Sequence, residues 1–123
     1  MIGRISFVAC ALAACAHTRT ADEYRADTAR AFTARGGDIK TCYDHVLATK
    51  REASGLVTVR FAVAEKTGKI TDVALDKSQT TAPDDLSQCV LGLLSSVTLA
   101  PADPNRGIAT WSWSFSAGSA QIP

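Results

Sequence analysis

The sequence lacks an apolar run long enough to cross a bilayer. Its apolar stretch near the start, Ile5 to Leu12, has about eight residues, whereas a membrane-spanning helix needs about 20. Charge of one sign is also lacking, because 13 Lys and Arg residues against 12 Asp and Glu residues leave a net charge of +1. The charges are scattered, without the concentrated basic patch that is typical of nucleic-acid binding. We therefore expect neither a transmembrane helix nor a nucleic-acid partner.

The residues that usually carry catalysis are also scarce. The sequence has only 2 histidines, and it has no G-x-S-x-G, H-E-x-x-H or phosphate-binding glycine motif. His17 precedes the predicted folded region, and His45 falls on the polar side of a predicted helix. The acidic pair Asp84-Asp85 fits the first turn of a helix, where negative charge is favourable. We predict no catalytic residue, no metal ligands and no cofactor, and hence no enzyme activity.

Apolar residues make up 46% of the sequence, which is enough for a packed core. The clearest pattern is a period-two alternation of apolar with polar or small residues from Gly55 to Val63, which predicts a half-buried strand. The polar run Glu65–Lys69 contains Gly68, which can adopt positive φ in a turn. Ile70 to Asp76 then predicts the second strand of a hairpin.

Helical periodicity brackets this hairpin. Apolar residues recur at i, i+3, i+4, i+7 and i+8 within Asp38–Arg51, and again after Pro83 from Leu86 to Val97. Alternation resumes from Ile108 to Ser116, where Trp111 and Trp113 are predicted core residues of a third strand. Ahead of these elements, residues 21–35 predict a helix whose apolar stripe is thin, so we expect it to pack loosely or to act as a spacer.

The predicted order from residue 38 is therefore helix, strand, strand, helix, strand, which is an α+β fold. The first strand would be central in a three-stranded antiparallel sheet, with two helices packed on one face. Four regions follow: residues 1–14 as a signal peptide, 15–37 as a tether and N-terminal helix, 38–116 as the folded domain, and 117–123 as a loose tail.

The first residues have the features of an export signal. Met1–Arg4 is a short positive segment, and small residues follow the apolar stretch. The sequence Leu12-Ala13-Ala14-Cys15 resembles the bacterial lipobox, in which a signal peptidase cuts before the cysteine and the cysteine is lipidated. Cleavage after Ala14-Cys15-Ala16 would also fit an ordinary signal peptidase. We favour the lipobox because the apolar stretch ends directly at Leu12. Lipidation of Cys15 would anchor the chain to a membrane that it does not span.

Two of the 4 cysteines remain once the signal is removed and Cys15 is lipidated. Cys42 and Cys89 each fall on the apolar stripe of a predicted helix, and an even pair in an exported protein indicates a disulfide. It would close a loop of about 48 residues, which the chain-entropy description values at about 4 kcal/mol. Two buried free thiols are the alternative. A metal site or a redox-active pair is disfavoured, because no second ligand pair and no C-x-x-C motif occur.

Taken in order, these segments resemble the C-terminal domain of TonB, and in particular its AgmX/PglI type. The resemblance covers residues 38–116 and rests on the motifs Cys42-Tyr43, Gly55–Val63, Gly68–Val73, Leu86 through Cys89-Val90, Pro101 and Pro104, and Trp113-Ser114-Phe115. It implies the fold given above and a habit of binding a protein partner. The transmembrane anchor and the long proline-rich spacer of TonB-type energy transducers are missing, so energy transduction is not implied.

In that family a partner segment is thought to add to an exposed sheet edge, through main-chain pairing. The corresponding edge here is Ile108–Ser116, with Thr110, Ser112 and Ser114 as candidate partner-contacting residues. The sequence thus predicts a non-enzymatic, lipid-anchored protein of the bacterial cell envelope. It would face the periplasm, on the outer membrane in preference to the inner, and bind an envelope protein. A lipoprotein that binds peptidoglycan and a thiol-dependent envelope enzyme are the alternatives.

Overall fold

The structure is a computed structural model that describes residues 18–116 and 119–121. The predicted signal peptide, with Cys15 and His17, lies outside the described residues. The elements are α2 (Ala21–Thr33), α3 (Gly36–Leu47), β1 (Gly55–Val63), β2 (Ile70–Leu75), the 3₁₀ turn η1 (Lys77–Gln79), α4 (Asp84–Leu94), β3 (Gly107–Ser116) and β4 (Ser119–Gln121).

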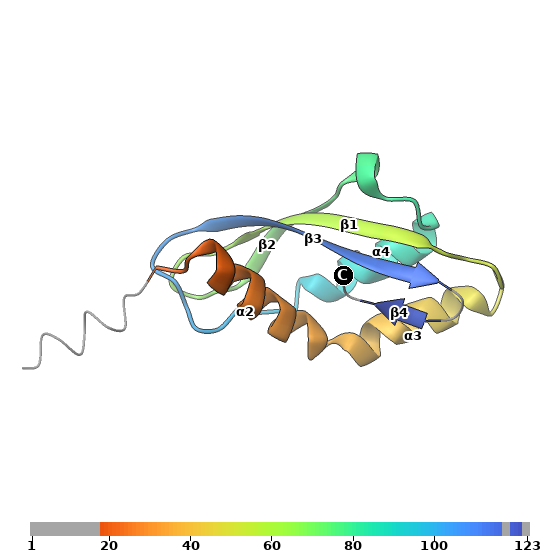
Figure 1. The fold of residues 1–123 in the computed structure, drawn as a ribbon, viewed down its shortest axis with the longest axis horizontal. Helices are drawn as coiled ribbons and strands as arrows, with labels where there is room; N and C mark the ends of the chain where they lie inside the picture. Colours follow the sequence, from red (N-terminus) through yellow and green to blue (C-terminus); the bar gives the residue numbers. More distant parts are fainter. Residues whose placement is uncertain (1–17, 117–118, 122–123) are drawn as a thin grey trace, which may run out of the picture.

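The strands form one antiparallel sheet in the order β2-β1-β3-β4 (Figure 1). β1 lies between β2 and β3, and its pairing with β3 is unbroken from Gly55 opposite Phe115 to Val63 opposite Gly107. The predicted α+β class and the central position of the first strand are therefore confirmed.

The turn and the second strand of the hairpin depend on positive φ angles. Gly68 has a φ of 75°, as the turn prediction required. Within β2 the register with β1 shifts between Arg60 and Ala62, and Asp72 has a φ of 53°. This bulge places one extra residue in β2. Because of it, Ile70 and Val73, three positions apart, both contact the core, which a regular period-two strand would not allow.

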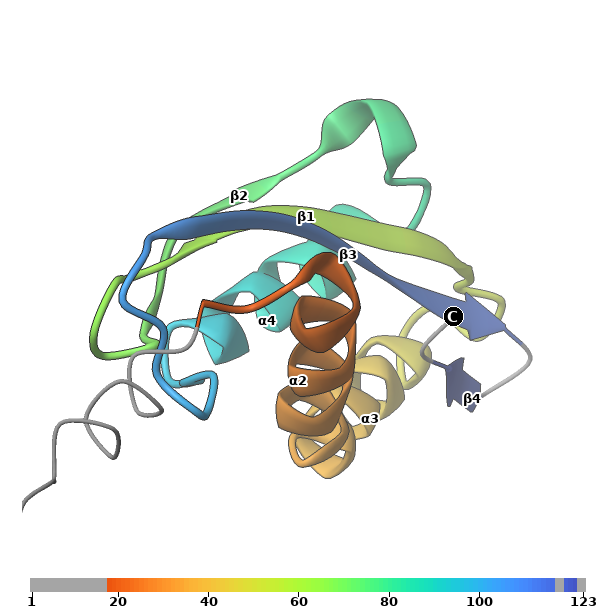
Figure 2. The same ribbon diagram turned by 60° about the vertical axis from the view of Figure 1, so that its left-hand side comes forward.

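The helices α2, α3 and α4 cover one face of the sheet, and η1 stands on the other (Figure 2). The core lies between the sheet and the helices, where Val57, Tyr43, Leu86 and Trp113 are each 1% exposed or less. Trp111 is partly buried and packs against this core, so both tryptophans are the core residues that the alternation predicted.

The predicted helix over residues 21–35 is present as α2, but the expectation that it packs loosely was wrong. Phe32 in α2 is 1% exposed. Its ring centroid lies 5.7 Å from that of Phe61 and 5.1 Å from that of Trp113. Phe32 is the one fully buried apolar residue of α2, Tyr24 and Ala31 pack against the same core, and aromatic pairs of this kind add to the energy of burial. Three helices therefore cover the face for which two were expected.

The expectation of a loose tail over residues 117–123 was also wrong in part. Ser119–Gln121 forms β4 and pairs with the end of β3, with Ser116 opposite Ser119. A strand of three residues is too short to show a period-two pattern, so no sequence signal marks it.

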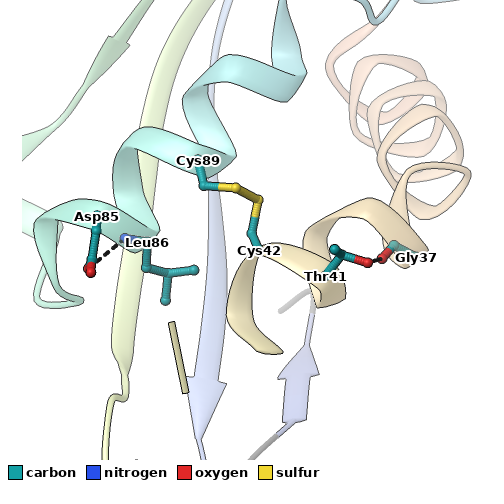
Figure 3. Close-up of a disulfide and its surroundings, with 6 residues drawn as sticks. All are labelled: Gly37, Thr41, Cys42, Asp85, Leu86 and Cys89. Carbon is teal, nitrogen blue, oxygen red and sulfur yellow. Dashed lines mark hydrogen bonds between the residues drawn. A yellow bond between two sulfur atoms is a disulfide. The ribbon is translucent and has the colours of Figure 1, made fainter. Parts of the chain in front are cut away.

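The predicted disulfide is present and joins α3 to α4 (Figure 3). The Cα atoms of Cys42 and Cys89 lie 5.8 Å apart, and the bond spans 47 positions of sequence. Cys42 is 3% exposed. Cys89 is an exposed residue, because the buried side of α4 runs through Leu86 and Val90, so the expectation that both cysteines point into the core was wrong for Cys89.

Candidate partner-binding edge

Only part of β3 has a strand on both sides. β1 pairs with all of β3, whereas β4 pairs with Ser114, Phe115 and Ser116 alone. Among the residues that the structure describes, no second strand pairs with 107–113. In an antiparallel ladder every second residue directs its N–H and C=O groups away from a given neighbour. Residues 107–113 therefore present main-chain donors and acceptors at an open edge, where an added strand could pair.

The three predicted contact residues lie on the sheet face opposite the helices, at different positions along this edge. Thr110 is exposed and borders the open part. Ser112 is half-buried, and its Oγ lies 2.7 Å from Oγ1 of Thr58 on β1. Ser114 is opposite Gln121 of β4, so this position of the edge is already paired. The open edge is therefore shorter than the predicted Ile108–Ser116, and Thr110 is the candidate best placed to meet a partner.

A groove runs along the open edge between β3 and α2. Its volume is about 160 Å³, and it is lined by Ala21, Tyr24, Arg25, Thr28, Ala109, Thr110 and Trp111. At one end Tyr24 packs so closely on Gly107 that a β-carbon there would overlap the tyrosine hydroxyl. The sequence could not predict this groove, because one of its walls is the helix that was expected to pack loosely or to act as a spacer.

One of the residues that line the groove carries a buried donor. Nε1 of Trp111 is inaccessible to solvent and has no hydrogen-bond partner within residues 18–116 and 119–121. A buried N–H group without a partner is destabilising, so most such groups find an acceptor. Trp113 has a similarly unpaired Nε1, but it lies deep in the core.

The residues weighed as catalytic candidates lie elsewhere. His45 is exposed on α3, and Asp84 and Asp85 form the first turn of α4 as predicted. Asp85 lies 3.1 Å from Nζ of Lys50, and this contact holds the pKa of the Asp85 carboxyl below its usual value of 3.8. Asp85 is thus a surface carboxylate paired across two elements.

A buried polar cluster that the sequence did not reveal holds the start of the described chain. Arg19, within the predicted tether, is 8% exposed. Its Nε donates to Oδ2 of Asp27 at 2.8 Å, and its guanidinium carbon lies 5.0 Å from the centroid of the Tyr24 ring. Because Tyr24 and Asp27 belong to α2, these contacts of Arg19 stabilise the position of the helix that forms one wall of the groove.

Comparisons with protein-family models, with curated proteins and with solved structures found no match. The resemblance to the TonB C-terminal domain therefore stays a prediction. Within the part of the chain that the structure describes, no helix is both long enough and apolar enough to span a membrane.

Proposed function

We propose that this protein is a lipid-anchored component of the bacterial cell envelope that binds a protein partner by strand addition and has no catalytic activity. The observation that carries the proposal is the open edge of β3 at residues 107–113, bordered by a groove with small and aromatic walls. Main-chain pairing supplies affinity at such an edge, and the groove supplies selectivity for side chains.

The disulfide supports an exported location. A bond between Cys42 and Cys89 forms and persists in oxidising compartments, and it is rare in the cytosol. The same bond disfavours a thiol-dependent enzyme, since neither sulfur is a free nucleophile. The lipobox-like sequence ending at Cys15 is the basis for the anchor, which we place on the periplasmic side of the outer membrane.

Photo-cross-linking in the native envelope tests the partner. A photoreactive amino acid replaces Thr110, which borders the open edge, or Lys77 in η1, which is also exposed and follows β2 at the opposite edge of the sheet. We expect a discrete protein adduct from position 110 and none of that mass from position 77. In a competition assay, an excess of protein without the photoreactive group should lower the yield of this adduct. The same competitor carrying Thr110→Pro should not lower it, and its melting temperature shows whether the variant is folded.

Absence of an adduct at position 110, or the same adducts from both positions, would contradict strand addition at this edge.

The anchor has its own test, which is the mass of the mature N-terminal peptide. We expect a diacylglyceryl group on Cys15, and an unmodified N-terminus would contradict it.

A further inference from the structure

One end of the sheet is tied together by a single buried residue. Asp103, in the segment before β3, is 1% exposed. Its Oδ2 accepts a hydrogen bond from the backbone N–H of Arg19 at 2.6 Å, and its Oδ1 accepts one from the N–H of Asn105 at 2.7 Å. Its backbone carbonyl accepts a third, from the N–H of Lys66 in the β1–β2 turn, at 2.7 Å. Three segments distant in sequence therefore meet at this end.

Two further contacts fix the start of the described chain there. Nδ2 of Asn105 donates to Oγ1 of Thr18 at 2.9 Å, and the guanidinium group of Arg19 donates to the carbonyl oxygen of Pro101. In both ribbon views the first described residues ahead of α2, the β1–β2 turn and the segment before β3 lie at the same end of the sheet (Figures 1 and 2). The point where the chain enters the fold is thus held rigidly against these loops.

The length of chain between this point and the proposed lipid anchor is short. Cys15 and Arg19 are four residues apart, and a fully extended chain covers at most about 3.6 Å per residue, so about 14 Å separates them at most. The polar headgroup layer of one leaflet is itself roughly 5–8 Å thick. If Cys15 carries the lipid, the fold begins at the membrane surface, without a flexible spacer that would let it turn freely.

The side chains at this end suit contact with phospholipid headgroups. Lys66, Lys69 and Arg106 are exposed there, together with the acidic residues Glu65 and Asp72, and Oδ2 of Asp72 lies 2.8 Å from Nη2 of Arg106. Asp103 is buried in the contacts described above. Ile108, the most exposed large apolar residue in the described chain at 70%, follows two residues after Arg106. Cations beside an aliphatic side chain match the boundary between headgroups and acyl chains.

We propose that the end of the domain formed by the β1–β2 turn and residues 101–106 rests on an anionic phospholipid surface, with Lys66 and Lys69 facing the headgroups. This inference rests on the proposed lipidation of Cys15. It fixes the orientation of the protein. The sheet stands away from the membrane, the open edge of β3 begins near the surface at Gly107, and β4 lies at the distal end.

Quenching by spin-labelled lipids measures this orientation. The acylated full-length protein is reconstituted into phosphatidylcholine vesicles with 30% phosphatidylglycerol and with a nitroxide on the headgroup. A fluorophore is attached either at Ala102→Cys, on the proposed membrane-facing end, or at Arg51→Cys, beyond the end of α3 at the other end of the sheet. Both positions are exposed. We expect at least twofold stronger quenching at position 102, and equal quenching at the two positions would overturn the inference.

The charge-reversal variant Lys66→Glu/Lys69→Glu tests the contact itself. Its vesicle binding should be unchanged because the lipid anchor is intact, whereas quenching at position 102 should fall toward that at position 51. Unchanged quenching would overturn the role of the two lysines. The same sample reports on the two claims separately. If the mature protein carries no acyl group, both the proposed anchor and this orientation are contradicted. If the protein is acylated but quenching is equal at the two positions, only the orientation is contradicted.

Discussion

The carboxylate of Asp103 accepts a hydrogen bond from the backbone N–H of Arg19 across 84 positions of sequence. The bond links the segment before β3 to α2, because the side chain of Arg19 in turn donates to Asp27 of α2. Replacing Asp103 with Ala should leave the N–H groups of Arg19 and Asn105 without their acceptor. The buried loss at Arg19 costs about 1–3 kcal/mol and the part-buried loss at Asn105 about 1 kcal/mol, so we expect the free energy of unfolding to fall by about 2–4 kcal/mol.

Chemical denaturation measures this change, and Asp44→Ala is the matched control. Asp44 pairs with Lys40 on the exposed surface of α3, and its side chain is 51% exposed. Surface pairs of this kind contribute about 0–1 kcal/mol. Equal effects of the two substitutions would show that Asp103 does not organise this end of the molecule.

Phe32 tests whether α2 belongs to the folded domain. Phe32→Ala should lower the free energy of unfolding by about 3–5 kcal/mol, the usual loss for a buried aromatic residue. The next residue, Thr33, is exposed, so Thr33→Ala should change stability by about 0.5 kcal/mol or less. A small loss from Phe32→Ala would mean that α2 is a loosely attached spacer after all.

Most of the architecture could be predicted from the sequence because it depends on repeated patterns. The alternation in β1 and β3 and the apolar stripes of α3 and α4 fixed the layers, the central strand and the disulfide pairing. Features carried by single residues were missed. Phe32 is the main apolar contact of α2 with the core, and the bulge at Asp72 leaves no mark on the alternation.

The candidate site was predicted less completely than the fold for a related reason. The strand that carries the edge could be predicted, because Trp111 and Trp113 alternate with polar residues. Two things that define the open part could not. One is β4, which covers Ser114 with a strand of three residues, and the other is α2, which turns the bare edge into one side of a groove. The contacts of Asp103 join residues far apart in the sequence, and no local pattern marks them.

The turn between β1 and β2 should depend on Gly68. Its φ is 75°, and a β-carbon there would overlap the backbone carbonyl oxygen of Leu99. Left-handed backbone alone costs a residue with a side chain about 1–2 kcal/mol, and relief of the overlap adds to that. We expect Gly68→Ala to lower the melting temperature clearly.

Gly92 provides the opposite expectation. It lies in α4, it is exposed, and no atom lies within 4 Å of a β-carbon built on it. Gly92→Ala should therefore raise stability by about 0.5–1 kcal/mol through helix propensity. Stabilisation by Gly68→Ala in the same series of melting curves would contradict the described turn.

The disulfide should account for a large part of the stability. The double variant Cys42→Ser/Cys89→Ser loses the cross-link, and the chain-entropy description predicts a loss of up to about 4 kcal/mol for a loop of this length. Because Cys89 is exposed, a reductant should produce much of the same loss in the unmodified protein. Labelling of two free thiols in the native, unreduced protein at these positions would contradict the bond.

Stability should also fall in acid through Asp85. Lys50 lowers the pKa of this carboxyl in the folded state below 3.8. The stabilising contact is therefore fully present above about pH 4, near the pKa of an unfolded aspartate, and is lost as the pH falls through the folded pKa. Asp85→Asn and Lys50→Gln should each make unfolding less dependent on pH below 4. Urea titrations at pH 3 and pH 6 measure the free energy of unfolding at each pH. The same difference between the two pH values in both variants as in the unmodified protein would contradict this role of the pair.

Hydrogen exchange on the complex with the partner that cross-links through position 110 tests strand addition most directly. Slower amide exchange should appear within residues 107–113 of β3. The amides of β2, the strand at the opposite edge of the sheet, serve as the internal reference and should exchange as they do in the free protein. Protection of β2 with none at residues 107–113, or no change at either edge, would contradict the account.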